Sequence, residues 1–322
     1  MTVSIIIPAY NAEQYIDRCF ASVFRNAPSE ELFEVIAVND GSKDNTLELL
    51  KKQSEQHRNV IVINQPNSGV SVARNNGIEA AKGEYVLFLD ADDELIEGSL
   101  SRLCAYLSEK CKIDMLMTRQ VTCKEGVYYH DQEPNLVEHK VYSGLEAYQN
   151  CFVRTNAGGG ICRRNFLKQY GIVFPEGVTN GEDTLFFAQV QVFAKSIVYF
   201  NLPLYQINVL VDSATRNKDP SKGARLFNSI KAAVDIKTKM MVDNERKGIF
   251  DYAIYQLISN TVSFYAGSKE LSFASFYKGI DFPNILPLNT RYMCMMRNKA
   301  KIMNCSITLF YFLSWLKIII NR

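Results

Sequence analysis

VSIIIPAYNAEQYIDRCFASVFRNAPSEELFEVIAVN, residues 3–39, begins and ends with short apolar, β-branched runs, VSIIIP at 3–8 and FEVIAVN at 33–39. Near-continuous hydrophobicity of this length is typical of strands that are buried on both faces of a sheet. The apolar residues between the two runs keep the i, i+3, i+4 spacing of one helical face: Ala12, Tyr15, Ile16, Cys19, Phe20, Val23 and Phe24. The stretch therefore predicts a βαβ unit.

The same alternation continues over the first 90 or so residues. NVIVIN at 59–64 and YVLFLD at 85–90 predict two further strands. A helix from Asp44, which can cap it, to about Glu55 and another over 70–81 would connect them. We therefore predict an α/β fold with a mostly parallel, Rossmann-like sheet that is flanked by helices.

Three loops directly follow predicted strands, at 8–11, 40–42 and 90–93. In a parallel sheet, ligands bind beyond the carboxyl ends of the strands, so these loops are expected at the binding edge. The pattern then becomes mixed, with a strand expected over 113–118 and a polar stretch that runs to Lys140. A helix at 183–194 and a strand at 197–205 follow, and from about Pro220 the chain is mostly helical in pattern.

Composition and charge limit the classes of protein. Thirty-six basic and 34 acidic residues give a formal net charge of +2, so no overall basic surface for nucleic acid is expected. The eight cysteines contain no C-x-x-C pair and there are three histidines, so neither a zinc site nor a thioredoxin-type motif is indicated. Unpatterned thiols and an N-terminus without signal-peptide features favour a cytoplasmic protein.

Asp90-Ala91-Asp92-Asp93 follows the apolar run at 85–90, so its carboxylates are expected at the binding edge of the sheet. Two carboxylates together with phosphate oxygens suit Mn²⁺ or Mg²⁺, which prefer oxygen ligands. Alone, the pattern more often marks a solvated turn or a helix N-cap ahead of Leu95. Haloacid-dehalogenase-like phosphatases also place D-x-D after a buried strand, but they require Thr or Val where this sequence has Glu94.

Three ordered blocks decide between these interpretations: VSIIIPAYNAEQYIDRCFASV, VNDGSKDNT and NSGVSVARNNGIEAAKGEYVLFLDADDEL. They resemble family 2 glycosyltransferases of the GT-A fold, and FPEGVTNGEDTLF at 174–186 is similar to that family's acidic motif on the acceptor side. The resemblance implies a metal-dependent enzyme with a nucleotide-sugar donor. It also implies a catalytic domain over 1–218, with a nucleotide-binding half at 1–110 and an acceptor half at 111–218, followed by a helical region over 219–322.

Carried over position by position, the resemblance implies that Pro8, Tyr10 and Asp40 hold the base and ribose of a nucleotide, with Arg74 nearby. Asp90 would be shared between the ribose and the metal. The chemistry agrees, since a tyrosine ring can flank a base and a carboxylate can accept from an imide N–H or a ribose hydroxyl. From the residues alone, Pro8, Tyr10 and Asp40 would lie in turns, and Arg74 would be a solvated helix residue.

The resemblance also implies the catalytic groups. Asp183 matches the family's catalytic base, which takes the proton of the acceptor hydroxyl, and Glu182 is a supporting neighbour. Asp92, with Asp90, would hold Mn²⁺ or Mg²⁺ against the donor diphosphate and stabilise the charge that develops there. The pattern alone reads Glu182-Asp183 as acidic residues at a helix N-terminus, a preference of about 0.3–1 kcal/mol. One carboxylate acting on an incoming hydroxyl implies inversion at the anomeric carbon.

Two features of the C-terminal third depart from a simple family pattern. Family members often carry an arginine or histidine shortly after a tyrosine that corresponds to Tyr205, but this sequence reads LYQINVLVDSATRN, so Arg216 replaces that cation or the contact is missing. The tail at 291–322 has six basic residues and no acidic one, with a mostly apolar run at 307–320. Fourteen residues are short of the about 20 that span a membrane.

Two interpretations of the tail therefore stay open. It could lie in the membrane interface, attracted to anionic lipid, or it could pack back on the catalytic domain. Similar bacterial enzymes commonly extend lipid-linked glycans at the inner face of the cell membrane, which slightly favours a peripheral membrane contact.

These observations predict an inverting glycosyltransferase that moves a sugar, from a UDP-sugar by preference, to a hydroxyl of a glycan or lipid-linked acceptor. Cell-surface polysaccharide or capsule synthesis is the expected setting. One alternative is a metal-dependent phosphatase, which Glu94 disfavours. The other is a degenerate family member that binds nucleotide without turnover. The presence of Asp40, Asp90, Asp92 and Asp183 disfavours it, but the altered segment after Tyr205 keeps it open. No nucleic-acid partner is expected.

Overall fold

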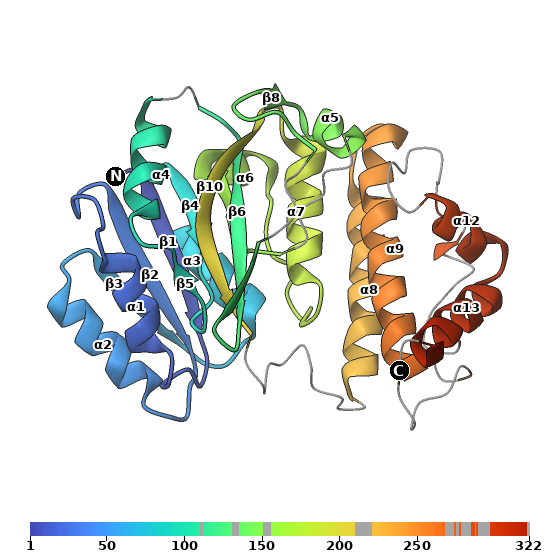
Figure 1. The fold of residues 1–322 in the computed structure, drawn as a ribbon, viewed down its shortest axis with the longest axis horizontal. Helices are drawn as coiled ribbons and strands as arrows, with labels where there is room; N and C mark the ends of the chain where they lie inside the picture. The colour runs from blue at the N-terminus through green and yellow to red at the C-terminus, as the bar shows by residue number, and fades with distance from the viewer. Residues whose placement is uncertain are drawn as a thin grey trace.

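The structure is a computed structural model that describes residues 1–109, 112–130, 135–150, 156–209, 221–267 and 297–320, with the single residues 274, 277, 285, 286 and 288. Figure 1 shows a central sheet with helices on both faces and a further helical layer toward the C-terminus. The predicted α/β class is confirmed.

Ten strands within the described residues form one sheet in the order β3-β2-β1-β4-β9-β6-β10-β5, with β7 paired to β6 and β8 paired to β10. The strands are β1 (Val3–Ala9), β2 (Phe33–Asp40), β3 (Val60–Gln65), β4 (Tyr85–Phe88), β5 (Glu94–Leu95), β6 (Met115–Lys124), β7 (Val127–His130), β8 (Val141–Tyr142), β9 (Gly160–Arg163) and β10 (Ile197–Asn208).

The sheet is mostly parallel. β1 pairs in parallel with β2 and β4, and β2 pairs in parallel with β3. β9 runs antiparallel between β4 and β6, so β6 and β10 point in the same direction as β1. The carboxyl ends of β1, β2, β4, β6 and β10 therefore meet at one edge, where the predicted site loops lie.

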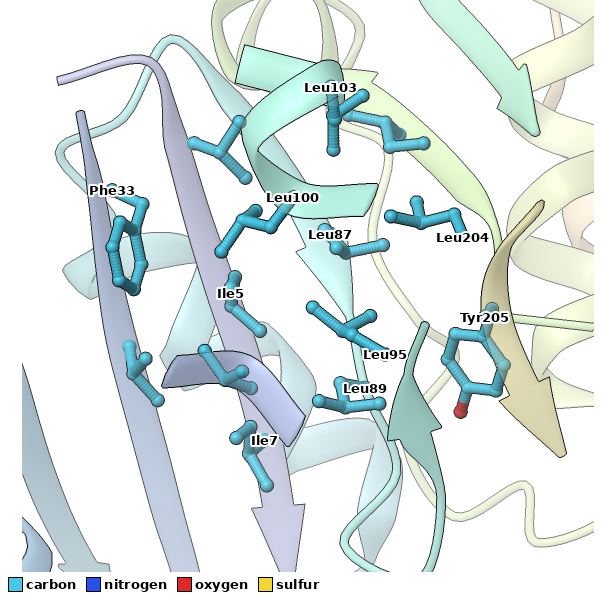
Figure 2. Packing of buried hydrophobic residues seen from close by; sticks show 14 of the residues in the cluster. Ile5, Ile7, Phe33, Leu87, Leu89, Leu95, Leu100, Leu103, Leu204 and Tyr205 are labelled. Atoms are coloured by element: carbon cyan, nitrogen blue, oxygen red, sulfur yellow. The ribbon is translucent and has the colours of Figure 1, made fainter. Parts of the chain in front are cut away.

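Helices cover both faces because side chains alternate along each strand. Ile5 and Ile7 of β1 belong to a core with α1 (Ile16–Phe24) and α4 (Ser99–Glu109). Figure 2 shows Leu100 of α4 beside Ile5 in this core. Ile6 faces the opposite side, where Gly77 of α3 (Val70–Ala80) lies so close that an added Cβ would collide with the isoleucine. The helix α2 (Thr46–Gln56) joins the first core through Leu50.

The helix α7 (Glu182–Phe193) is buried on two sides. Phe186, Phe187 and Val190 pack in the sheet-side core, which also contains α6 (Arg164–Tyr170). Leu185 and Val192 belong instead to a third core with α8 (Ser221–Lys239) and α9 (Asn244–Gly267). Figure 1 shows α7 between the sheet and these two long helices.

The C-terminal helices pack back on this layer. Met303 of α12 (Arg297–Cys305) and Ile307 and Phe310 of α13 (Ile307–Ile320) are buried in the third core, and α13 contacts α9. Among the described residues, no helix has both the length and the apolar character needed to cross a membrane.

The structure corrects several element predictions. The strand expected over 113–118 runs on to Lys124 and forms a hairpin with β7, within the stretch expected to be only polar. Leu95 begins no helix, because it lies in β5 opposite Tyr205, so the N-cap interpretation of the acidic turn is wrong. β10 ends at Asn208 and α8 begins at Ser221; the boundary proposed at 218 lies outside the described residues.

Candidate active site

The acidic segment forms a tight turn between β4 and β5. The backbone N–H of Asp93 donates to the carbonyl of Asp90 at 3.0 Å. α1 holds the turn from one side: the Arg18 guanidinium donates to the Asp92 carbonyl at 2.7 Å, and the Ser22 hydroxyl accepts from the Leu95 N–H at 2.9 Å. The sequence therefore folds into a turn that fixes the backbone of all three aspartates.

Asp93 points into the protein. Its Oδ2 accepts from the Tyr205 hydroxyl at 2.7 Å, and its Oδ1 accepts from the Asn208 N–H at 2.8 Å. Burial, with the charges of Asp90 and Asp92, raises the pKa of Asp93 to about 8. The Tyr205 hydroxyl also accepts from the Asp90 N–H at 3.1 Å, so the end of β10 clamps the turn.

Asp92 has a different environment from Asp93. Within the described part of the chain no side chain donates a hydrogen bond to its carboxylate, although its backbone carbonyl accepts from Asn208 at 3.0 Å. Burial, followed by the charge of Asp90, raises the pKa of Asp92. Its own backbone N–H and the charge of Arg18 lower this pKa, but no side chain hydrogen-bonds the carboxylate within the described residues. A carboxylate that is desolvated beside a like charge in this way is suited to a cation.

Arg74 joins the acidic turn to the other predicted acids. It lies on α3 with 3% of its side chain exposed, and it donates through Nη2 to Asp90 Oδ1 at 2.8 Å. Its Nη1 donates to Asp183 Oδ1 at 2.6 Å and lies 3.5 Å from Glu182 Oε1. The solvated-helix interpretation of Arg74 is therefore wrong, because the structure gives its charge three carboxylate partners.

Glu182 and Asp183 form the first turn of α7. Asp183 Oδ2 accepts from the Ala157 N–H at 3.1 Å, so a donor contacts each of its oxygens. Burial and then the charge of Asp183 raise the pKa of Glu182 to about 7, against the lowering effect of Arg74. The predicted base and its neighbour thus share one site with Asp90.

The glycine run after Ala157 positions this loop. Gly158 packs so closely that an added Cβ would collide with Gln120 Nε2 and lie 2.8 Å from the Tyr205 ring. The Gln120 amide donates to the Gly158 carbonyl at 2.8 Å. The absence of a side chain at Gly158 therefore serves internal packing beside Tyr205.

The predicted nucleotide residues occupy the neighbouring loops. Asp40 is buried at the end of β2, where its Oδ1 accepts from Gln65 and the Ser68 N–H and its Oδ2 accepts from the Gly69 N–H, all within 2.9 Å. These bonds orient the loop that precedes α3. Pro8 is buried within β1, whereas the Tyr10 side chain is 48% exposed. The nucleotide roles of these residues stay predictions.

The structure adds residues that the sequence analysis did not assign to the site: Arg18, Asn208, and Tyr205 as a partner of Asp93. Tyr205 was noted only as the start of a family segment. Each contacts the acidic turn from more than 70 positions away in the chain, and nothing local in the sequence marks such a pairing. Arg216, the candidate diphosphate cation, lies outside the described residues.

Comparison with known proteins identifies the family. The model of glycosyl transferase family 2 matches residues 4–171, just over half of the chain, and the chain belongs to this family. Glycosyltransferase GlyA of Streptococcus pneumoniae is 27% identical over 223 residues, which are 66% of this chain and 31% of that protein. The poly(ribitol-phosphate) beta-glucosyltransferase of Bacillus spizizenii is 29% identical over 199 residues, 61% of this chain and 30% of that protein.

The chain thus spans about a third of the length of these two relatives. Among solved structures, S. aureus TarS 1-349 in complex with UDP-GlcNAc superposes with a TM-score of 0.75. The match covers 100% of this chain and 93% of that one at 21% identity, so it shows a shared fold.

Proposed function

We propose that the protein is an inverting glycosyltransferase that moves a sugar from a nucleotide-sugar, UDP-linked by preference, to a hydroxyl of a cell-surface glycan or lipid-linked acceptor. One observation carries the proposal: the buried Arg74 guanidinium bridges the Asp90 carboxylate in the acidic turn at the sheet edge and the Glu182-Asp183 pair. The acidic turn supplies the donor side of such a site, and the start of α7 supplies the acceptor side.

In this mechanism Asp183 takes the proton of the acceptor hydroxyl as that oxygen attacks the anomeric carbon. Hydrogen bonds from Arg74 and the Ala157 N–H orient the carboxylate before the acceptor binds. The nucleoside diphosphate leaves from the opposite side of the sugar, which inverts the anomeric centre. Glu182 lies beside the base and supports it or contacts the acceptor.

Asp92, together with Asp90, would hold Mn²⁺ or Mg²⁺. No three His, Cys, Asp or Glu side chains gather into a metal cage within the described ranges. In the proposed site the two carboxylates would supply the protein ligands and phosphate oxygens of the donor would supply others, as is usual for cations bound with a nucleotide. When bound, the cation would neutralise the charge that develops on the diphosphate. The missing side-chain donor at Asp92 and its raised pKa support this assignment.

The acceptor class is inferred from the relatives. The Bacillus spizizenii relative is named for transfer to poly(ribitol-phosphate), a polymer that presents hydroxyls, and the S. aureus TarS structure contains UDP-GlcNAc. By analogy, we infer a UDP-hexose or UDP-N-acetylhexosamine donor and a polyhydroxylated surface polymer as acceptor.

The test is a panel of nucleotide-sugars, assayed for nucleoside diphosphate release by the full chain with and without Mn²⁺. The proposal expects release from at least one UDP-sugar, dependent on a divalent cation. Asp92→Asn should lose cation-dependent donor binding, whereas Asp183→Asn should still bind the donor and lose transfer by about 100-fold or more. Glu176→Gln, an exposed acid near the same loop, is the matched control. Near-normal turnover of Asp183→Asn would refute the base assignment, and phosphate release from simple esters would instead support a phosphatase.

We also propose that the outward face of α13 contacts anionic lipid. Ile307 and Phe310 are buried against α9, whereas Leu309, Phe312 and Leu313 are exposed at i, i+3, i+4 spacing. Exposed Lys299 and Lys301 lie on the preceding helix, and each basic residue near a membrane surface contributes about 1 kcal/mol of attraction. The inner face of α13 thus packs on α9, in the helical region over 219–322, and the proposal assigns its exposed face to the membrane.

The membrane proposal is tested by sedimentation with phosphatidylserine-containing vesicles. A variant with Leu309→Ser, Phe312→Ser and Leu313→Ser should lose most vesicle binding and keep its melting temperature, because these side chains are exposed. Met241→Ser, an exposed apolar residue between α8 and α9, is the control. Equal binding of the triple variant and the wild type would contradict the proposal.

A further inference from the structure

Arg74 is the point at which the two halves of the site meet. One terminal nitrogen of its guanidinium contacts Asp90 in the donor-side turn, and the other contacts Asp183 at the start of α7. The third nitrogen, Nε, is buried without a hydrogen-bond partner in the described part of the chain. The position of the guanidinium is therefore set by the two carboxylates that it bridges.

The surroundings of Arg74 keep its charge fixed. Burial alone would lower the pKa of Arg74, but the charges of Asp183, Asp90 and Glu182 raise it above the usual value. The guanidinium carbon lies 5.0 Å from the centre of the Phe174 ring, which excludes water from one side. A lysine could not replace this arrangement, because one ammonium lacks the planar fork that reaches two separated carboxylates.

We propose that Arg74 is a positioning residue that couples cation and donor binding at the acidic turn to the acceptor base. This inference rests on the proposed function. A cation at Asp90 competes with Arg74 for the charge of that carboxylate, so the guanidinium is bound more strongly by Asp183. In the same way, loss of charge at Asp183 leaves the positive charge of Arg74 directed at Asp90, where it opposes a cation. Such coupling between two sites is reciprocal.

If Arg74 couples the two sides of the site, a change at Asp183 should affect cation binding at the acidic turn. If the two sides are independent, it should not. Asp183→Asn should weaken the binding of Mn²⁺ in the presence of UDP, although Asp183 is not a proposed metal ligand. We expect a loss of about fivefold or more, at the lower end of typical couplings. In an Arg74→Gln background, the same Asp183→Asn change should alter Mn²⁺ affinity by less than about twofold.

The experiment is a double-mutant cycle on Mn²⁺ affinity, measured from the free Mn²⁺ signal in electron paramagnetic resonance with UDP present. It uses the full chain and no turnover. If the neutral variant does not fold, Arg74→Lys takes the place of Arg74→Gln in the cycle. In the lysine background, the effect of Asp183→Asn on Mn²⁺ affinity should then be at most half of its effect in the wild-type background. The control is Arg163→Lys, a change in another partly buried ion pair, with Asp114, outside the acidic turn; it should leave Mn²⁺ affinity unchanged.

Steady-state kinetics provide a second readout. Arg74→Lys should lower kcat by about tenfold or more with a smaller change in donor KM, because Asp183 loses the guanidinium that orients it while the other proposed nucleotide residues, such as Asp40, are unchanged. If the wild type binds no Mn²⁺ with UDP, the metal assignment of the proposed function is wrong and the coupling with it. If the wild type binds Mn²⁺ but the cycle is additive, the coupling is refuted while the proposed function stands.

Discussion

Asp90, Asp92 and Asp93 are neighbours in the sequence, but their carboxylates have different partners. Asp90 binds the buried guanidinium of Arg74, Asp93 binds Tyr205 inside the protein, and Asp92 has no side-chain donor among the residues that the structure describes. The backbone turn produces this difference because it directs successive side chains to different sides. At the scale of single residues, environment rather than residue type assigns the roles.

Tyr205→Phe is the first prediction at this scale. The change removes a donor to Asp93 and an acceptor for the Asp90 N–H, and it leaves a buried carboxylate short of a partner. We expect a loss of about 1–3 kcal/mol in the free energy of unfolding, measured by urea denaturation at pH 9, where the Asp93 carboxyl is ionised. Tyr199→Phe on the same strand, whose hydroxyl bonds Asn201, is the control and should cost less. Equal losses of free energy of unfolding for the two variants would contradict the proposed role of Tyr205 in holding the acidic turn.

Glu182→Gln is the second prediction, and it concerns pH. The pKa of Glu182 rises from 4.5 to about 7 on folding, so the folded state binds more protons between these values and stability falls as pH rises through this window. The glutamine variant lacks this loss. Between pH 4 and pH 8, the free energy of unfolding of the variant should therefore rise by up to about 3 kcal/mol relative to that of the wild type.

Urea denaturation of Glu182→Gln and the wild type at both pH values measures this difference. Glu176→Gln, at an exposed position, is the control. The difference between its free energy of unfolding and that of the wild type should be the same at both pH values. If the glutamine variant instead loses stability relative to the wild type as pH rises, the proposed environment of Glu182 is wrong.

The sequence predicted part of this site and missed the rest for a physical reason. Asp90, Asp92 and Asp183 stand in local motifs, and the structure brings Asp90 and Asp183 to one guanidinium. The burial of Arg74 could not be predicted from its helix, since a solvated arginine and a paired one have the same sequence pattern. The carboxylates that compensate its charge come from two other segments of the chain.

At the scale of elements, the loop before β9 links the sheet to α7. It supplies the Ala157 N–H to Asp183 and places Gly158 against the Tyr205 ring. Asp183, the proposed base, and Tyr205, which holds the acidic turn, are therefore both contacted by the same short segment.

Gly158→Ala tests this link. The added methyl group would meet Gln120 and the Tyr205 ring, so either the loop or the ring must move. We expect a loss of about 1–3 kcal/mol in the free energy of unfolding, as is typical of overpacking, together with reduced transfer activity. Gly171→Ala has open space around it and a left-handed backbone, so its cost should be about 1 kcal/mol with activity retained. Full activity of Gly158→Ala would contradict the proposed role of the loop.

The elements with a strong local pattern were predictable, and those made by tertiary pairing were not. β1 and β2 are continuous apolar runs, and the structure places them in parallel register. β5 has two residues, too few for any periodicity, and it exists because Leu95 pairs with Tyr205. β9 begins in a glycine run that resembles a loop, and its pairing with β4 and β6 overrides that preference.

At the scale of the whole molecule, the helical C-terminal layer completes the catalytic part. α7 has one face in the sheet-side core and the other in the core with α8 and α9. We predict that a fragment ending at residue 209 will expose Leu185, Ala188 and Val192, and that it will aggregate or bind a hydrophobic dye. Size-exclusion chromatography and dye fluorescence of the fragment, compared with those of the full chain, measure its aggregation and its exposed apolar surface. A monomeric, cooperatively unfolding fragment would contradict it.

The position of α7 has a consequence for protein engineering. The helix that carries Glu182 and Asp183 at its first turn is held between two layers, and its outer face matches side chains of α9 such as Phe250 and Ile254. A chimaera that takes its last hundred residues from a relative will therefore misplace the acids unless the outer face of α7 is exchanged with them.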